Sequence, residues 1–294
     1  MGLPGASTRP RTLNPSTTSR VKQSLNSKSI TLKYVQLIVL KIKWLSNKCG
    51  SNKMEFSKLQ YLPIFMYLWF MSTFVLTYVI SVIQKDVEPI FPYISDTGTF
   101  TPTSCIFGQL LNVGSILLSI IIYIRYLQIK EINGHLTKGL YSSNVTCLIL
   151  GWLASLGVGL VANFQETEVF SIHIFGAIMA FGLGSVYQLI QCHISAKTMK
   201  ECRISQHVVN FRWILGIVST VTFFTCFCFA GLAMMKYQGT DMTKWKKADG
   251  GYSLHLVSTI TEWILGVATM TYVFTFTFDF QHFKLIEPTL QFFD

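Results

Sequence analysis

The chain of 294 residues contains little charge. Asp, Glu, Lys and Arg together make up 13% of it, whereas soluble domains carry about 25%. Half of the residues are hydrophobic, and the mean hydropathy is +0.43. Because a soluble domain of this size would lack the polar residues to cover its surface, the apolar residues must face lipid. The composition predicts an integral membrane protein.

Motifs of soluble catalysis are also missing. The seven cysteines are scattered and form no Cys-x-x-Cys pair of the kind that binds zinc. No phosphate-binding loop and no Ser/His/Asp set occurs with a soluble domain to hold it. The histidines lie near the ends of apolar stretches, which is not the spacing of haem ligands on facing helices. We therefore expect no enzyme, no cofactor and no metal.

Acidic residues are almost absent from the start of the chain. Residues 1–60 hold 11 of the 24 Lys and Arg but only one acid, Glu55. We expect residues 1–53 to be a disordered basic extension, or alternatively an isoform or gene-model addition. The charge lies beside membrane segments rather than on a folded soluble face, so nucleic acid is not an expected partner. Anionic membrane lipid is the expected partner of such an arm.

Six apolar stretches follow, each near the roughly 20 residues that a bilayer crossing needs. The sequence therefore predicts an all-α polytopic protein with a membrane domain over 54–283 and a short tail over 284–294. Lys and Arg are biased to one side, with 19 on the side of the N-terminus and five on the other. The positive-inside rule then places both termini in the cytosol. The predicted spans are 61–83, 106–128, 141–164, 169–193, 211–235 and 254–276.

Several polar side chains lie at membrane depth in the non-cytosolic half. An ionised Glu262 would be costly in lipid, so it should face the bundle, with Asn112, Asn163 or His173 as a partner. Two interpretations stay open, namely a pocket that senses protons or lipid headgroups and plain hydrogen bonds between helices. The predicted cluster consists of Asn112, Asn163, Gln165, His173, His255 and Glu262.

Two further features concern loops and packing. The loop after the first span carries Tyr93, Ser95, Asp96, Thr97 and Gly98, which predict either a turn on the non-cytosolic surface or a loop that binds a partner or lipid. Small residues at a spacing of four in spans 3 and 4 predict close helix contact and a tight hairpin. They are Gly151, Ser155 and Gly159 in span 3, and Gly176, Ala180 and Gly184 in span 4.

A set of short motifs, in this order, resembles the damage-regulated autophagy modulator (DRAM) family over about residues 55–290. The motifs are Pro92-Tyr-Ile-Ser-Asp-Thr-Gly-Thr99, Gly251-Tyr-Ser-Leu-His255, Glu262-Trp263 and Asp279-Phe-Gln281.

The resemblance implies six helices, lysosomal or endosomal membranes, a role in promoting autophagy, and no catalytic residues. Membrane lipids and proteins of the autophagy machinery are the implied partners. Two alternatives stay open. One is a plasma-membrane protein that organises lipid or acts as a signalling adaptor. The other is a transporter or channel lined by the polar cluster, although no Gly or Pro break interrupts the predicted spans.

Overall fold

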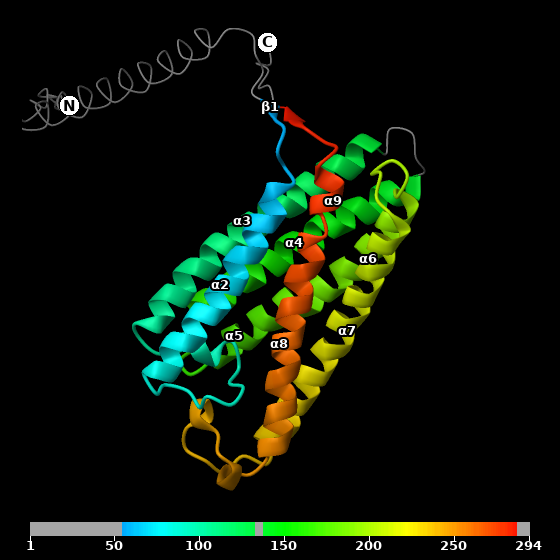
Figure 1. Cartoon of the computed structure of the whole chain (residues 1–294). Coiled ribbons are helices and arrows are strands. Elements are labelled where there is room, and N and C mark those ends of the chain that lie inside the picture. The colour runs from blue at the N-terminus through cyan, green and yellow to red at the C-terminus, as the bar shows by residue number, and fades with distance from the viewer. Residues whose placement is uncertain (1–54, 133–137, 287–294) are drawn as a thin grey trace, which may run out of the picture. The chain divides into compact units, whose positions relative to one another are not determined.

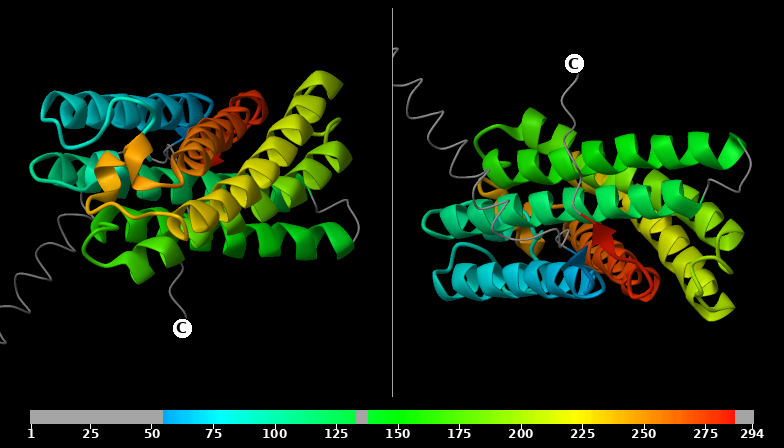
Figure 2. Two further views of the ribbon diagram at one scale, coloured as in Figure 1. Left: turned by 90° about the horizontal axis from the view of Figure 1, so that it is seen from below. Right: turned by 90° about the horizontal axis from the view of Figure 1, so that it is seen from above.

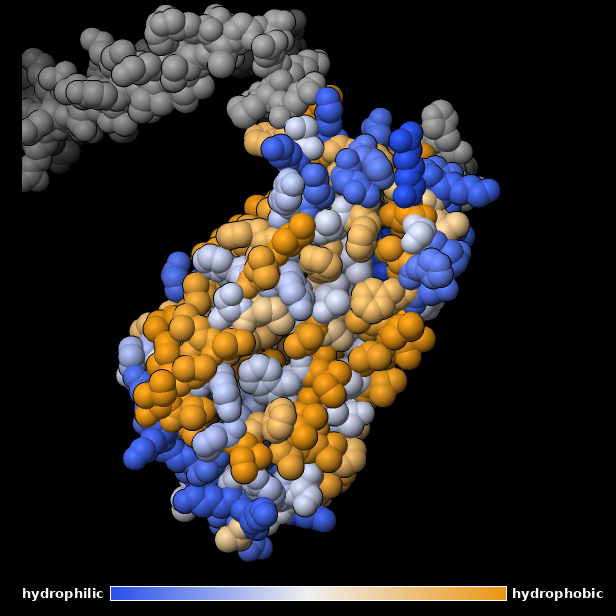
Figure 3. Space-filling view, in the orientation of Figure 1, coloured by the Kyte–Doolittle hydropathy of each residue, from blue (hydrophilic) through white to orange (hydrophobic). Residues whose placement is uncertain are grey.

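The computed structural model describes residues 55–132 and 138–286. Within these residues, six helical segments are long and apolar enough to cross a membrane, and they lie side by side in one bundle (Figure 1). On the face that Figure 3 shows, a band of apolar side chains covers the middle of the bundle between two polar ends. The prediction of an all-α, six-span membrane protein is confirmed. The segments are α2 (Tyr61–Ile83), α3 (Thr103–Ile132), α4 (Lys138–Asn163), α5 to α6 (Phe170–Lys197), α7 (Gln206–Met234) and α8 (Tyr252–Phe274) with the short α9 (Thr277–Phe280).

Most helices are longer than the predicted spans. Helix α3 begins three residues before the predicted 106, and α7 begins at Gln206 instead of 211. The hydroxyl of Ser205 caps α7 by accepting a hydrogen bond from the Val208 N–H at 3.4 Å. Hydropathy marks the part of a helix that suits lipid, whereas caps of this kind decide where the helix ends. The extension 1–53 and the tail beyond residue 286 lie outside the described residues.

The fourth span is one continuous helical segment, but it is not a uniform α-helix. Helix α5 (Phe170–Ala177) passes into a π-helical segment, η3 (Ile178–Leu183), and then into α6 (Gly184–Lys197). Apolar residues suit either backbone pattern, so hydropathy carries no signal for this change. Short π-helical segments occur frequently at functional sites.

Spans 3 and 4 form the expected hairpin, and Gly176 and Ala180 of the predicted row in span 4 make the contact, but they pack against Gly157 instead of the predicted row in span 3. A Cβ at Gly157 would lie 2.5 Å from the backbone nitrogen of Ala180 and 2.6 Å from the carbonyl oxygen of Gly176. The predicted row in α4 faces α3 instead, since a Cβ at Gly151 would lie 2.8 Å from the Ile122 side chain. In span 3, the spacing of small residues therefore predicted a close-packed helix face but not which helix packs against it.

Both ends of the described chain meet at one end of the bundle. Strand β1 (Glu55–Phe56) pairs antiparallel with β2 (Leu285–Ile286), and we call this the terminal end. The opposite end, here the loop end, carries two long connections, residues 84–102 and 235–251 (Figures 1 and 2). The short helices η1 (Asp96–Gly98), η4 (Met242–Lys244) and η5 (Lys247–Asp249) lie in these connections. The cytosolic position of the terminal end stays a prediction.

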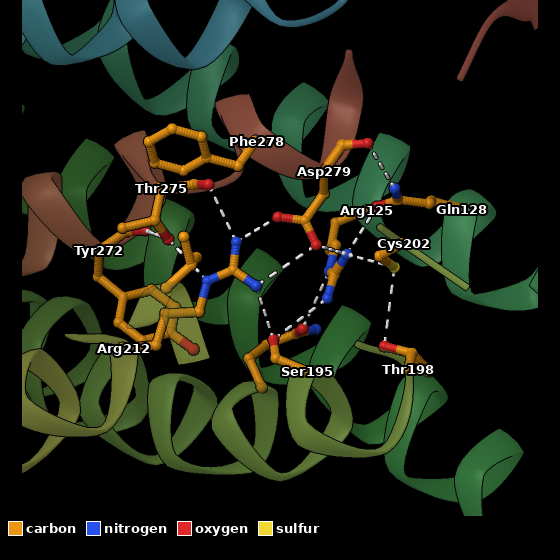
Figure 4. Close-up of polar contacts among 12 residues, drawn as sticks. Arg125, Gln128, Ser195, Thr198, Cys202, Arg212, Tyr272, Thr275, Phe278 and Asp279 are labelled. Atoms are coloured by element: carbon orange, nitrogen blue, oxygen red, sulfur yellow. Dashed lines mark hydrogen bonds and ion pairs between the residues drawn. The ribbon is translucent and has the colours of Figure 1, made fainter. Parts of the chain in front are cut away.

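A buried ion-pair cluster joins the helices near the terminal end (Figure 4). Arg125 of α3, Arg212 of α7 and Asp279 of α9 have side chains with 0% exposure. Nη1 of Arg125 donates to one carboxylate oxygen of Asp279 at 2.7 Å, and Nη2 of Arg212 donates to the other. Both arginines lie near the ends of predicted spans, where flanking charges of the cytosolic side are expected, so the sequence did not predict this cluster.

Neutral groups satisfy the remaining donors of the two arginines. The Ser195 hydroxyl of α6 accepts from both guanidinium groups, at 3.3 Å and 2.8 Å. Thr275 accepts from Arg212 through its hydroxyl and its carbonyl. The ring of Phe276 lies about 5 Å from both guanidinium carbons, within the range of a cation–π contact. The cluster therefore connects α3, α6, α7 and the end of the sixth span through one carboxylate.

Replacing that carboxylate should destabilise the bundle strongly. We expect Asp279→Asn to cost about 3–5 kcal/mol, because it leaves two buried cations without an anion. The apparent melting temperature of the purified protein in lipid nanodiscs measures the loss. Asp241→Asn is the matched control, since Asp241 pairs with Lys244 at a half-exposed site where ion pairs contribute about 1 kcal/mol or less. Equal melting temperatures for the two variants would contradict a stabilising role of the cluster.

Candidate functional site

The first long connection folds into the loop end of the bundle. Asp96, Thr97 and Gly98 form η1 and are buried, which corrects the expectation of a turn on the surface. The Thr97 hydroxyl contacts that of Thr77 at 3.0 Å, and Ser81 donates to the Thr97 carbonyl at 2.7 Å. These hydroxyls of α2 provide the polar partners that the loop backbone needs inside the protein. The loop therefore forms a buried plug rather than a free surface loop.

The sixth span holds the same loop from the other side. The buried carboxylate of Glu262 accepts a hydrogen bond from the Ile94 N–H at 2.7 Å. The Trp263 indole donates to the Pro92 carbonyl at 2.8 Å, and the Tyr93 hydroxyl donates to Ser258 at 2.8 Å. Glu262 thus faces the bundle as predicted, but its partner is a loop backbone amide.

A second carboxylate, Glu166, comes from the turn between α4 and α5. Its Oε2 accepts from the Ser95 hydroxyl at 3.2 Å and lies 3.9 Å from Nε2 of His173. The other ring nitrogen of His173 donates to the Phe164 carbonyl at 2.7 Å. Since a carbonyl can only accept, Nδ1 carries a proton, and a second proton on Nε2 would complete an ion pair with Glu166. Sequence reasoning missed Glu166 because a carboxylate in a short turn is usually exposed.

The environment of Asp96 is unfavourable to its charge. Burial and the neighbouring Glu166 raise the pKa of the Asp96 carboxyl well above its ordinary range, although the Tyr93 N–H donates to it at 3.1 Å. Burial also raises the pKa of the Tyr93 hydroxyl. The surroundings therefore favour the neutral forms of both groups.

These groups line a cavity of about 300 Å³ between α5 and α7, near the lower limit of ordinary ligand sites. One end of the cavity is polar and contains Asp96, Glu166, Glu262, His173 and Ser95. Its walls are apolar and aromatic. The wall residues are Tyr93, Phe170, Ile174, Ala177, Phe181, Cys226, Phe227, Ala230, Gly231, Met234, Met242 and Trp245.

The cavity opens between the start of α5 and the end of α7. Phe170, Met234 and Met242 are its most exposed large side chains. Gly231 also lines it, and a Cβ at this position would have nothing within 4 Å. The fold does not need a glycine there for close packing, so Gly231 leaves open space at the cavity.

A smaller cavity of about 80 Å³ continues from the same polar end into the bundle. It shares Ser95, His173 and Glu262 with the larger one and reaches Tyr187 and Gln188. The Tyr187 hydroxyl and the side-chain oxygen Oε1 of Gln188 have no hydrogen-bond partner within the described part of the chain. Beyond them lies the Arg125–Asp279–Arg212 cluster, whose side chains are fully buried.

The structure separates the predicted polar cluster into four parts, of which the first three lie near the large cavity or the turn before α5. Glu262 and His173 lie at the large cavity. His255 lies behind the cavity wall, with its ring stacked on Trp245 at 4.3 Å and edge-on to Tyr93 at 5.2 Å. Gln165 lies at the turn, where its carbonyl accepts from the backbone N–H of two later residues.

The two predicted asparagines are not at this cavity. Nδ2 of Asn112 donates to Asn163 at 3.0 Å, and Nδ2 of Asn163 donates back at 2.8 Å. They line a separate groove on the outer face of α3 and α4. Over residues 55–132 and 138–286, no group of three or more His, Cys, Asp or Glu is arranged to hold a metal ion.

The raised pKa of Asp96 predicts that stability falls as pH rises. The unfolded chain ionises Asp96 near pH 3.9 (about its ordinary pKa), whereas the folded state resists ionisation. The stabilising contribution is therefore complete below about pH 4 and is lost as pH rises through the folded-state pKa. Melting temperatures in nanodiscs between about pH 4 and pH 8 should fall less for Asp96→Asn than for the wild type. Asp241→Asn should keep the wild-type profile, and an Asp96→Asn profile parallel to it would refute the assignment.

Comparisons with known proteins agree with this fold. The family model for the Frag1/DRAM/Sfk1/Cwh43P N-terminal domain matches residues 58–283. DNA damage-regulated autophagy modulator protein 2 of Bos taurus is 34% identical over 236 residues, which cover 79% of this chain and 88% of that protein. The human modulator protein 1 is 33% identical over 225 residues, covering 76% and 92% of the two chains.

A more distant relative also carries an autophagy name. The modulator of macroautophagy TMEM150B-B of Xenopus laevis is 31% identical over 223 residues, which cover 75% of this chain and 85% of that protein. No solved structure matches the chain. The chain therefore belongs to the DNA damage-regulated autophagy modulator family, within the wider Frag1/DRAM/Sfk1/Cwh43P group.

Proposed function

We propose that the chain modulates autophagy as a non-enzymatic, multi-pass protein of lysosomal or endosomal membranes, with its loop end in the lumen. We propose further that it acts by binding an amphiphile with an amino head group in the cavity between α5 and α7. The relatives are named as modulators of autophagy, which supports the autophagy role. The observation that carries the binding proposal is the composition of the cavity.

The polar end of the cavity suits a cation. Three carboxyl groups, Asp96, Glu166 and Glu262, line it together, and none of the lining residues is Lys or Arg. Tyr93 and Trp245 line the same cavity, and aromatic rings stabilise an ammonium group through cation–π contact. The apolar wall from Phe170 to Phe181 and from Phe227 to Met234 suits a hydrocarbon chain. An amine on a single chain matches both parts.

The terminal end of the bundle is closed, which supports a ligand-binding site rather than a transport path. A transport path would need to continue from the small cavity through the level of Arg125, Arg212 and Asp279. These side chains have no exposed surface, and hydrogen bonds occupy them. The cavity therefore ends inside the bundle, as expected for a binding site.

Imaging and autophagic flux test this function. The tagged chain should lie on lysosomal or endosomal membranes, and its expression should change the turnover of an autophagy cargo reporter. Gly231→Leu should abolish that change while leaving the location intact, because it adds bulk to the cavity wall at a position where a Cβ would have no atom within 4 Å. Phe224→Leu is the control, on an exposed position of the same helix.

Two outcomes would contradict the proposal. A rim at the plasma membrane would favour the lipid-organising alternative instead. Full activity of Gly231→Leu at wild-type abundance would separate the autophagy role from the cavity.

A further inference from the structure

A polar groove runs along the outer face of the bundle, between α3 and α4. It has a volume of about 520 Å³ and lies on the apolar band of two predicted spans. Hydroxyl and amide groups in hydrocarbon lose their hydrogen bonds to water, so bundles normally turn them toward another helix. The polar and small residues of the groove are Asn112, Ser115, Ser119, Ser155, Gly159 and Asn163.

Ser155 lies in this groove with an unsatisfied hydroxyl. Its exposure is 2%, and Oγ has no hydrogen-bond partner among the residues that the structure describes. A buried hydroxyl without a partner costs free energy. The groove therefore presents a donor and acceptor that the bundle itself leaves unused.

Gly159 is a second feature that the bundle does not explain. A Cβ there would meet only Asn112 Oδ1 and Ser115 Oγ, both at 3.9 Å. At Gly151 and Gly157, in the same helix, a Cβ would lie within 2.9 Å of neighbouring atoms. The glycines at 151 and 157 are required by packing inside the bundle, whereas Gly159 opens onto the groove. A glycine in that place lets an external helix approach the backbone of α4 closely.

We propose that this groove is the interface through which two copies of the chain dimerise in the membrane. The same face of α3 and α4 from each copy packs together about a two-fold axis. The interface is independent of the ligand cavity, which lies between α5 and α7.

The chemistry of the groove fits a second copy of itself. Its polar groups are all neutral hydroxyls and carboxamides, and each of these both donates and accepts. A surface of such groups is complementary to its own copy, as an isologous two-fold interface requires. Among the groove-lining residues none is charged, so the groove offers no ion pair to a charged partner helix.

Dimerisation can be measured by energy transfer between labelled full-length chains in liposomes, over a series of protein-to-lipid ratios. The wild type should show transfer that falls on dilution with lipid. Gly159→Leu should need at least a tenfold higher protein-to-lipid ratio for the same transfer, because its side chain fills the groove. Its melting temperature should stay near that of the wild type, since a Cβ at Gly159 would meet no atom closer than 3.9 Å.

Gly231→Leu is the matched control, because it adds the same side chain at a glycine outside the groove where a Cβ also has no close neighbour, and it should dimerise as the wild type does. A monomeric wild type at all ratios, with or without a co-purified lipid or other protein in the groove, would overturn the proposal. Unchanged transfer in Gly159→Leu, or equal loss in both variants, would also overturn it.

Discussion

The carboxylate of Asp279 is the group on which the terminal end of the bundle depends. It contacts Arg125 of the second span and Arg212 of the fifth, and all three side chains are fully buried. A charge inside a membrane protein is costly unless it is paired, so the three residues constrain one another and the helices that carry them. Ser195 and Thr275 complete the shell. This end is therefore closed by specific contacts rather than by apolar packing alone.

The loop end has the opposite character, because the carboxyl groups at its cavity have no arginine or lysine partner among the described residues. Glu262 is held by a loop amide and Glu166 by a serine hydroxyl, and no Lys or Arg lines the cavity beside them. The π-helical segment places Phe181 in the cavity wall, and Gly231 leaves open space in the facing wall. The bundle thus has one closed end and one open, acidic end. This asymmetry suits recognition of a cationic amphiphile from one side of the membrane.

The sequence predicts correctly those features that the lipid environment requires of any membrane protein. Six apolar runs predict six spans because a backbone in hydrocarbon must bond to itself. Glu262 and His173 were found because ionisable groups at membrane depth usually face the interior. Asn112 and Asn163 were grouped with them wrongly, since depth along a helix does not say which neighbour it faces. Arg125 and Arg212 lie near span ends and are indistinguishable from the flanking positive charges of the cytosolic side. The burial of Asp96 depends on hydroxyls of α2 that no local pattern reveals.

The most direct test of this account is ligand-dependent stability of the purified protein in nanodiscs. Dodecylamine and dodecanoic acid share one chain length and differ in the charge of the head group. We expect dodecylamine to raise the melting temperature of the wild type and of Phe224→Leu, by mass action on the folded state. It should leave Gly231→Leu unchanged, and dodecanoic acid should stabilise none of the three. Equal stabilisation by the acid and the amine, or an undiminished effect of the amine on Gly231→Leu, would contradict a cation-selective cavity between α5 and α7.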